Sequence, residues 1–294
     1  MSLKELIISP DQEGRRVSDC VRSALPDLPE SVVRRIFDSR DVKLDEIRVS
    51  RDQAVRSGQS LKIYVPDACR NSSDSLSSLS VVYEDDDVLL VNKRAGISVE
   101  ADARGGVTLT DLCAAYAAEK DPDSFPPAAC HRLDNRTSGL CLFAKNPQAL
   151  EILQDVFRRR NLEKYYVCLV RGIMKPPSAV CRAWLVKDAR RACVRITDHA
   201  EPDARPIETG YEALESGPVS RLRVHLITGR THQIRAHLAA LGHPVLGDDL
   251  YGDRAFNRRE KARALKLCAV SLKLDTGGRL PAIDGKTFTV DPPF

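Results

Sequence analysis

Asp134 is the side chain whose neighbours in the sequence are best suited to chemistry. It lies in the segment HRLDNRTSGL, with Arg132 and Arg136 on either side and a Thr-Ser-Gly turn after it. An arginine fork can hold a carboxylate bidentately and lower its pKa, which keeps it ionised. Most aspartates beside arginines instead form structural ion pairs, so a salt-bridged surface residue is the alternative interpretation. Asp134 is therefore the candidate reactive group.

A second segment of similar character, LITGRTHQIRAHL, follows much later in the chain. It places Arg230 between a strand-like run and a helix, in which Ile234, Leu238 and Leu241 recur at helical spacing. Gly242, with a proline shortly after it, marks the end of that helix. The segment thus offers an arginine to a carboxylate such as Asp134, provided that the fold brings the two together.

Other kinds of site lack their sequence signatures. None of the six histidines lies in an HExxH arrangement, and His232 and His237 point in different directions on a helix. Ser138 lacks the GxSxG setting of a hydrolase nucleophile, so we expect it to serve a turn. No GxGxxG or Walker loop is present. The nine cysteines include no CxxC pair, which argues against a zinc ribbon and a complete disulfide framework. We expect no metal.

Composition indicates an ordinary globular protein. With 294 residues the chain exceeds the usual size of one domain, so we expect two units. No apolar run approaches the roughly 20 residues that span a bilayer, and the start of the chain does not resemble a signal peptide. We therefore expect a cytoplasmic protein without a membrane partner. The formal net charge of +4 permits an anionic partner without requiring one.

The first 66 residues carry a helix-helix-hairpin pattern. Apolar spacing predicts helices over 17–25 and 30–37, and β-rich runs predict short strands over 42–44, 47–49 and 61–65. This order resembles the alpha-L RNA-binding module. The resemblance implies an RNA-facing second helix and following loop, with the residues Arg34, Arg35, Arg40 and Lys43. A purely structural appendage is the alternative, because the segment has Asp45-Glu46 where that family usually has Asn-Gly.

The remainder of the chain follows a serine-rich linker over 67–80. Residues 81–294 contain a hairpin candidate over 81–96, helices that begin at Thr108 and at Asn146, and more strands than helices. Hairpins are mixed with inserted helices, without strict β-α alternation. The order predicts an α+β domain with a mixed, mainly antiparallel sheet, and we expect it to contain a central cleft.

Two long motifs in this region, HRLDNRTSGL and GRTHQIRAHLAALGHPVLGDDLYG, strongly resemble those of the pseudouridine synthases of the large-ribosomal-RNA (RluA-like) type. Between them, KYYVCLVRG is similar to the tyrosine strand of that family, with Tyr166 as the tyrosine and Cys168 in place of alanine. Upstream, LLVNKRAGISV is similar to its NKPAG hairpin, with Arg94 in place of proline. The resemblance covers residues 81–294. The two replacements put substrate preference in doubt more than activity.

The resemblance implies a reaction and a role for each matching residue. A uridine in RNA has its glycosidic bond broken and its base rejoined to the ribose through carbon 5, without a cofactor. Asp134 would be the essential carboxylate, acting as a nucleophile or as a base, and Arg230 would orient it. Tyr166 would stack on the uracil and assist proton transfer; the alternative is an ordinary core aromatic.

Further RNA contacts are expected around these residues, because a base inside a helix must be turned out of its stack. His131 and Arg132 are placed to contact phosphate or fill the vacated space, or else only to fix the loop. Arg235, near a helix start, is expected to meet a phosphate. Thr137 and Ser138 are expected to satisfy backbone groups of the loop.

The sequence therefore predicts a cytoplasmic, monomeric RNA pseudouridine synthase. Ribosomal RNA of the large subunit (23S) is the first candidate substrate, because the appended module is typical of the members that modify it, and transfer RNA is the second. Two alternatives remain open. One is a non-catalytic RNA-binding or ribosome-assembly protein with the same fold, and the other is a hydrolase that uses Asp134 on a small substrate.

Overall fold

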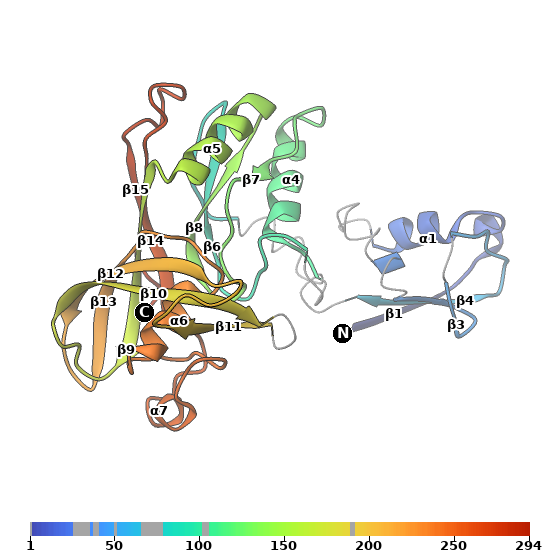
Figure 1. Ribbon diagram of the computed structural model, residues 1–294. Coiled ribbons are helices and arrows are strands. Elements are labelled where there is room, and N and C mark those ends of the chain that lie inside the picture. The colour runs from blue at the N-terminus through green and yellow to red at the C-terminus, as the bar shows by residue number, and fades with distance from the viewer. Residues whose placement is uncertain are drawn as a thin grey trace. The chain divides into compact units, whose positions relative to one another are not determined.

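The chain divides into two compact units in the computed structural model. One contains residues 1–79 and 98–126, and the other contains residues 80–97 and 127–294 (Figure 1). The structure describes residues 2–25, 36–37, 41–49, 52–65, 79–101, 106–188 and 192–294. Among the helices so described, none is long and apolar enough to cross a membrane.

The first unit contains a small antiparallel sheet packed against a helix. The sheet has the order β1-β4-β2-β3. Its elements are β1 (Ser2–Ile7), the 3-10 helix η1 (Pro10–Gln12), α1 (Val17–Ala24), β2 (Val42–Leu44), β3 (Ile47–Arg48) and β4 (Ser60–Val65). The predicted first helix and three predicted strands are confirmed, whereas β1 was not predicted. Of the predicted second helix only Ile36 and Phe37 are described, and both are helical; Arg34, Arg35 and Arg40 lie outside the described residues.

The turn between β2 and β3 holds two residues with positive φ. Asp45 has φ 50° and Glu46 has φ 65°, a conformation in which Asn and Gly are favoured. Asp45 is fixed there, because its carboxylate accepts from the backbone N–H of Ser60 at 2.9 Å. Lys43 lies 3.5 Å from a carboxylate oxygen of Glu46 and over the ring of Tyr64. The hairpin thus already engages the lysine that was expected to face RNA.

Helix α4 (Leu109–Lys120) also belongs to the first unit. Thr108 caps it as predicted, since the Thr108 side chain accepts from the backbone N–H of Asp111 and the Asp111 carboxylate accepts from that of Thr108. This reciprocal capping satisfies two backbone donors at the helix start.

The second unit is built on an eleven-stranded sheet (Figure 1). The strands are β5 (Val81–Glu84), β6 (Val88–Lys93), β7 (Ala128–Ala129), β8 (Ser138–Ala144), β9 (Leu162–Arg171), β10 (Ser178–Asp188), β11 (Cys193–Thr197), β12 (Arg205–Glu215), β13 (Val219–Leu226), β14 (Leu267–Leu274) and β15 (Thr287–Thr289). Their order is β11-β10-β12-β13-β9-β14-β8-β6-β5, with β15 beside β14 and β7 beside β8. The pairing of β8 with β14 is parallel and the other described pairs are antiparallel. The predicted α+β class and mainly antiparallel sheet are confirmed.

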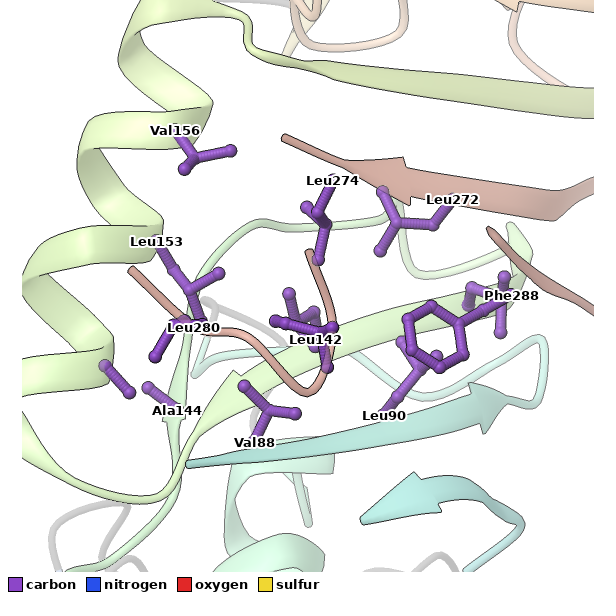
Figure 2. Packing of buried hydrophobic residues seen from close by; sticks show 13 residues of the cluster. Val88, Leu90, Leu142, Ala144, Leu153, Val156, Leu272, Leu274, Leu280 and Phe288 are labelled. Carbon is purple, nitrogen blue, oxygen red and sulfur yellow. The ribbon is translucent and has the colours of Figure 1, made fainter. Parts of the chain in front are cut away.

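Helix α5 (Pro147–Arg159) packs against one end of this sheet. Asn146 caps it, and its side chain accepts from the backbone N–H of Ala149 at 2.8 Å. Leu153 and Val156 then point from the helix toward Leu142 of β8 and Leu274 of β14 (Figure 2). This apolar cluster also takes in side chains of β6 and β15, so it fixes the strands that precede and follow the candidate site.

The remaining helices are α6 (Gln233–Ala240) and α7 (Arg254–Arg259). In α6 the predicted apolar face is confirmed at Ile234 and Leu238, which are buried, but Leu241 is exposed. Gly242 follows with φ +85°, as expected for a glycine that ends a helix. Helix α6 lies against β11 and β12, and this placement brings its polar side chains to the site.

Candidate active site

Asp134 lies in a turn immediately before β8. The backbone N–H of Thr137 donates to the Asp134 carbonyl at 3.0 Å and closes the turn. Thr137 and Ser138 are buried, and the Ser138 hydroxyl donates to the carbonyl of Leu267. The carboxylate itself keeps 23% of its side-chain surface exposed. The turn therefore presents a carboxylate at the surface from a rigid, buried base.

The close approach of β8 to β14 brings this turn near Tyr166. Gly139 pairs with Ala269, and Ala269 pairs on its other side with Tyr166 of β9. Gly139 has φ +110°, and a Cβ atom there would lie 2.2 Å from the Ala269 carbonyl oxygen. Only glycine permits this conformation and this distance. The glycine of the TSGL segment thus has a positional role in assembling the site.

Arg235 of α6 is the arginine that binds Asp134. Its Nη1 lies 3.2 Å from Asp134 Oδ2. Its Nε and Nη2 donate to the two carboxylate oxygens of Asp248, at 2.7 and 2.9 Å. The Arg235 side chain is only 5% exposed and that of Asp248 is fully buried. A buried bidentate pair of this kind holds the guanidinium in one orientation.

The charges of this pair stabilise each other. Burial lowers the pKa of the Arg235 guanidinium. The bonds to Asp248 and Asp134 raise this pKa by more than burial lowers it, so the net shift is upward. Burial raises the pKa of Asp248, but Arg235 and the backbone N–H groups of Tyr251 and Leu250 lower it overall. Both groups are therefore charged at neutral pH.

The two oxygens of Asp134 differ in their contacts with the residues that the structure describes. His232 contributes a further contact to Oδ2, at 3.8 Å from its Nε2, while its Nδ1 lies 2.9 Å from the Tyr251 hydroxyl. Within the described residues, Oδ1 accepts no hydrogen bond. The carboxylate is thus fixed by one oxygen and available through the other.

Arg230 was expected to orient Asp134, but the arginine bound to Asp134 in the structure is Arg235. Helix α6 begins at Gln233, so Arg230 precedes it, and the Arg230 side chain is exposed. No ion pair joins it to Asp134 in the described part of the chain. Arg235 was expected to meet an RNA phosphate, whereas in the structure its side chain is buried and bound to two carboxylates.

Buried amide and hydroxyl groups hold α6 in register with the sheet. The Gln233 side chain donates to the Glu208 carbonyl at 3.1 Å and to the Thr209 hydroxyl at 3.0 Å. It accepts from the Thr228 hydroxyl at 2.9 Å. His237 Nδ1 lies 3.0 Å from the same Thr209 hydroxyl. The polar residues of THQIRAH therefore position Arg235.

Tyr166 of β9 is 6% exposed. Burial raises the pKa of its phenol strongly, and the negative charge of Asp134 raises it further. Its hydroxyl has no hydrogen-bond partner among the residues that the structure describes. Tyr166 is therefore a neutral phenol within electrostatic reach of Asp134.

Tyr165 faces the other side of the sheet, as the alternation of a strand requires. Its ring stacks with that of His225, and the Arg223 guanidinium lies 4.2 Å from the ring centroid. These residues, with Gly210 and others, line a hollow of about 360 Å³. The hollow lies on the face away from Tyr166, so it is not part of the candidate active site.

Lys93, at the end of β6, belongs to the site but was not predicted. It is 1% exposed, and its ammonium donates to the carbonyls of Arg94, Ile97 and Asn135 at 3.1, 2.8 and 3.0 Å. Burial lowers its pKa to about 8, although Asp134 counteracts part of this effect. The sequence pattern that could have indicated it is a lysine at the end of an apolar, strand-like run. Lys93 ties the NKRAG hairpin to the turn that carries Asp134.

His131 has contacts within the protein that suit the alternative expected for it, which was to fix the loop. Its Nε2 accepts from the backbone N–H of Leu142 at 3.2 Å, and its ring stacks on Phe157 with centroids 4.9 Å apart. Burial and the nearby Lys164 lower its pKa to about 3, so it is a neutral acceptor. Arg132 is exposed, which agrees with a contact to RNA.

The described residues hold no cluster of three or more histidine, cysteine or acidic side chains that could bind a metal ion. All eight of the described cysteines are free thiols. The candidate site brings together a carboxylate, a buried guanidinium and a phenol.

Comparisons with known proteins give the family. The sequence profile described as RNA pseudouridylate synthase matches residues 87–240, about half of the chain. The chain is 34% identical over 262 residues to the ribosomal large subunit pseudouridine synthase C of Vibrio vulnificus, which covers 85% of this chain and 80% of that protein. It is an RNA pseudouridine synthase.

Other relatives agree with this assignment. The synthase is 31% identical to the protein of the same name from Escherichia coli K12, over 88% of this chain and 82% of that one. The solved structure of human RNA pseudouridylate synthase domain containing 1 is 28% identical, with a TM-score of 0.59 over 74% of this chain and 84% of that one. Human RNA pseudouridylate synthase domain containing 4, at 24% identity and a TM-score of 0.62, shares the fold over 75% of the synthase and 91% of its own chain.

Proposed function

We propose that the synthase isomerises uridine in the large-subunit (23S) ribosomal RNA and that Asp134 is its essential carboxylate. In this reaction the bond between N1 of uracil and C1′ of the ribose breaks, and a bond between C5 and C1′ forms. The proton on C5 is lost and N1 gains a proton, so the composition of the RNA is unchanged. The ribosomal substrate is supported by the names of the bacterial relatives.

The observation that carries the proposal is the asymmetric hold on Asp134. Oδ2 is bound by Arg235, whereas Oδ1 accepts nothing from the described residues. A nucleophile or a base needs a fixed orientation together with a free oxygen, and this arrangement supplies both. Asp134 thus suits either attack on the sugar or removal of a ribose proton.

The remaining residues take supporting roles. Tyr166 stacks on the uracil, and because its pKa is raised it does so as a neutral phenol that keeps its proton and can donate a hydrogen bond. Arg132, exposed beside the Asp134 turn, helps to hold open the RNA from which the uridine has been turned out. Arg235 and Lys93 orient Asp134 without touching the substrate.

We further propose how the chain is organised around this reaction. Residues 1–66 form an alpha-L module that binds RNA, a linker over 67–80 tethers it, and residues 81–294 form the catalytic domain with a central cleft. Lys43 takes part in RNA binding, together with Arg34, Arg35 and Arg40. The protein acts as a monomer in the cytoplasm.

The test is chemical mapping of pseudouridine in RNA from cells that lack the protein. We expect one or more sites in 23S ribosomal RNA to be lost, to return with the wild-type protein and to stay absent with Asp134→Asn. Transfer RNA from the same cells is mapped alongside. Loss of sites only in transfer RNA would contradict the ribosomal substrate, and an active Asp134→Asn variant would contradict the role of the carboxylate.

A further inference from the structure

Lys164 is a cation on the active face of β9 that none of the roles above uses. It lies two residues before Tyr166, so the two side chains leave the strand on the same face. It is half-buried, with its ammonium 5.7 Å from the centroid of the Phe157 ring. A Cβ atom at Gly229 would lie only 3.1 Å from the Lys164 Nζ, so the ammonium rests against the backbone before α6.

The part of the chain that the structure describes supplies no anion to this ammonium. No hydrogen bond or ion pair of Lys164 exists within the described residues. Glu163, its neighbour on the strand, points to the opposite face and pairs there with Lys273 at 3.8 Å. His131, on the shared Phe157 ring, is a neutral imidazole.

A second cation adds to the positive charge. Arg160 ends α5 in the left-handed conformation with φ 62°, and its side chain is exposed. Burial and then the charge of Arg160 lower the pKa of Lys164 to about 8. A half-buried cation has lost part of its hydration, and a second cation within electrostatic reach destabilises its charge. An external anion stabilises such a charge by replacing the lost water.

We propose that Lys164 binds a backbone phosphate of the RNA next to the nucleotide that occupies the site. Lys164 and Tyr166 are separated along the strand by about 6.6 Å, which is of the order of the length of one nucleotide. If the uracil stacks on Tyr166, an adjacent phosphate can therefore reach Lys164. The inference rests on the proposed placement of the substrate at Asp134 and Tyr166.

This placement also gives Gly229 a function. A side chain there would displace the Lys164 ammonium from its present position. The glycine of the GRTHQIR segment thus leaves space for the ammonium of the lysine that is proposed to bind phosphate. We expect Gly229→Ala to weaken RNA binding in the same direction as Lys164→Met but by less, because the lysine keeps its charge and has to shift only slightly.

The experiment compares Lys164→Met with Lys273→Met. Both variants remove one lysine charge from neighbouring strands, but Lys273 is paired with Glu163 on the opposite face and 47% exposed. RNA affinity is measured in the Asp134→Asn background as a function of salt, and turnover is measured in the native background. We expect Lys164→Met to weaken binding about tenfold and to reduce the slope of log K against log salt by about 0.7 to 0.9, which is the loss of one phosphate contact.

The controls make the outcome decisive. Lys164→Arg should keep most of the salt slope, Lys273→Met should keep all of it, and Lys164→Met should raise KM more than it lowers kcat. Equal affinity and equal salt slope for Lys164→Met and Lys273→Met would overturn the inference. Absence of pseudouridine formation by the wild-type protein would instead contradict the proposed function. The RNA affinities and salt slopes would then still test whether Lys164 binds a phosphate. If Lys164→Met does not fold, Lys164→Gln takes its place in the comparison with Lys273→Met, and equal affinity and salt slope for those two variants would overturn the inference.

Discussion

Substitution of Arg235 by methionine is the sharpest test of the site. Methionine keeps much of the apolar stem but removes the guanidinium that joins Asp134 to Asp248. Asp248 is fully buried and would lose both of its side-chain donors. Removal of one partner of such a pair leaves an uncompensated buried charge, which costs about 3–5 kcal/mol.

Turnover should suffer as well, because Asp134 loses the bond that orients it. A misplacement of about 1 Å in a catalytic group can lower the rate about 100-fold, so we expect kcat to fall by at least that factor. Arg235→Lys keeps the charge but not the fork, and a single ammonium cannot reproduce the bidentate bond to Asp248 and reach Asp134 as well. We therefore expect Arg235→Lys to lower the free energy of unfolding by about 1.5–3 kcal/mol, which is less than the loss expected for Arg235→Met.

The control is Arg230→Met, which removes the neighbouring arginine of the same motif. Its side chain is exposed and unpaired within the described residues, so the free energy of unfolding should change by less than about 0.5 kcal/mol. Trp184, the one tryptophan of the chain, lies on β10 and reports the unfolding of the second unit in urea. Similar stability losses for Arg235→Met and Arg230→Met would refute the assignment of the buried arginine.

Two further substitutions test how the turn before β8 is held. Burial lowers the Lys93 pKa from 10.5 to about 8, so between these pH values the unfolded chain binds more protons than the folded protein. The free energy of unfolding of the wild type, relative to that of Lys93→Met, should therefore rise from pH 8 toward pH 10.5. The total rise should be roughly 3 kcal/mol. A flat difference measured by urea unfolding across that range would contradict a buried ammonium. Gly139→Ala should cost more than about 3 kcal/mol, because strain at positive φ and a clash with Ala269 add together, whereas Gly96→Ala, with φ +96° but open space around it, should cost about 1–2 kcal/mol. Equal melting temperatures for the two glycine variants would show that β8 and β14 do not approach as closely as described.

The order of elements was largely predictable from local signals. Asn146 with Pro147, and Thr108 with Asp111, mark helix starts through caps that the structure contains. The turn residues and the alternation of apolar residues in the second unit predicted most of its strands. Local chemistry decides such features, so the sequence alone reveals them. Strand β1 was missed, because its pairing with β4 is a contact between distant segments.

The partner of Asp134 was not predictable in the same way. Arg230 and Arg235 lie in one motif, and the structure gives Arg235 the bond to Asp134 that was expected of Arg230. The difference depends on where α6 begins, and the boundaries of a helix are uncertain by several residues in a sequence. A start at Gln233 turns Arg235 inward and leaves Arg230 in solvent. Asp248, which fixes Arg235, lies in the GDDLYG end of the longer motif, but nothing in the sequence showed that its side chain meets Arg235.

The unequal division of the Arg235 fork explains why the site needs a second aspartate. An arginine that donated two parallel hydrogen bonds to Asp134 would occupy both oxygens of that carboxylate and leave neither for the substrate. With Asp248 as the bidentate partner, the guanidinium is fixed by a buried group and offers Asp134 a single bond. Lys93 adds a second buried positive charge near the same turn. The two buried cations and two carboxylates balance in charge, so Asp134 can stay ionised and fixed while one oxygen remains for the substrate.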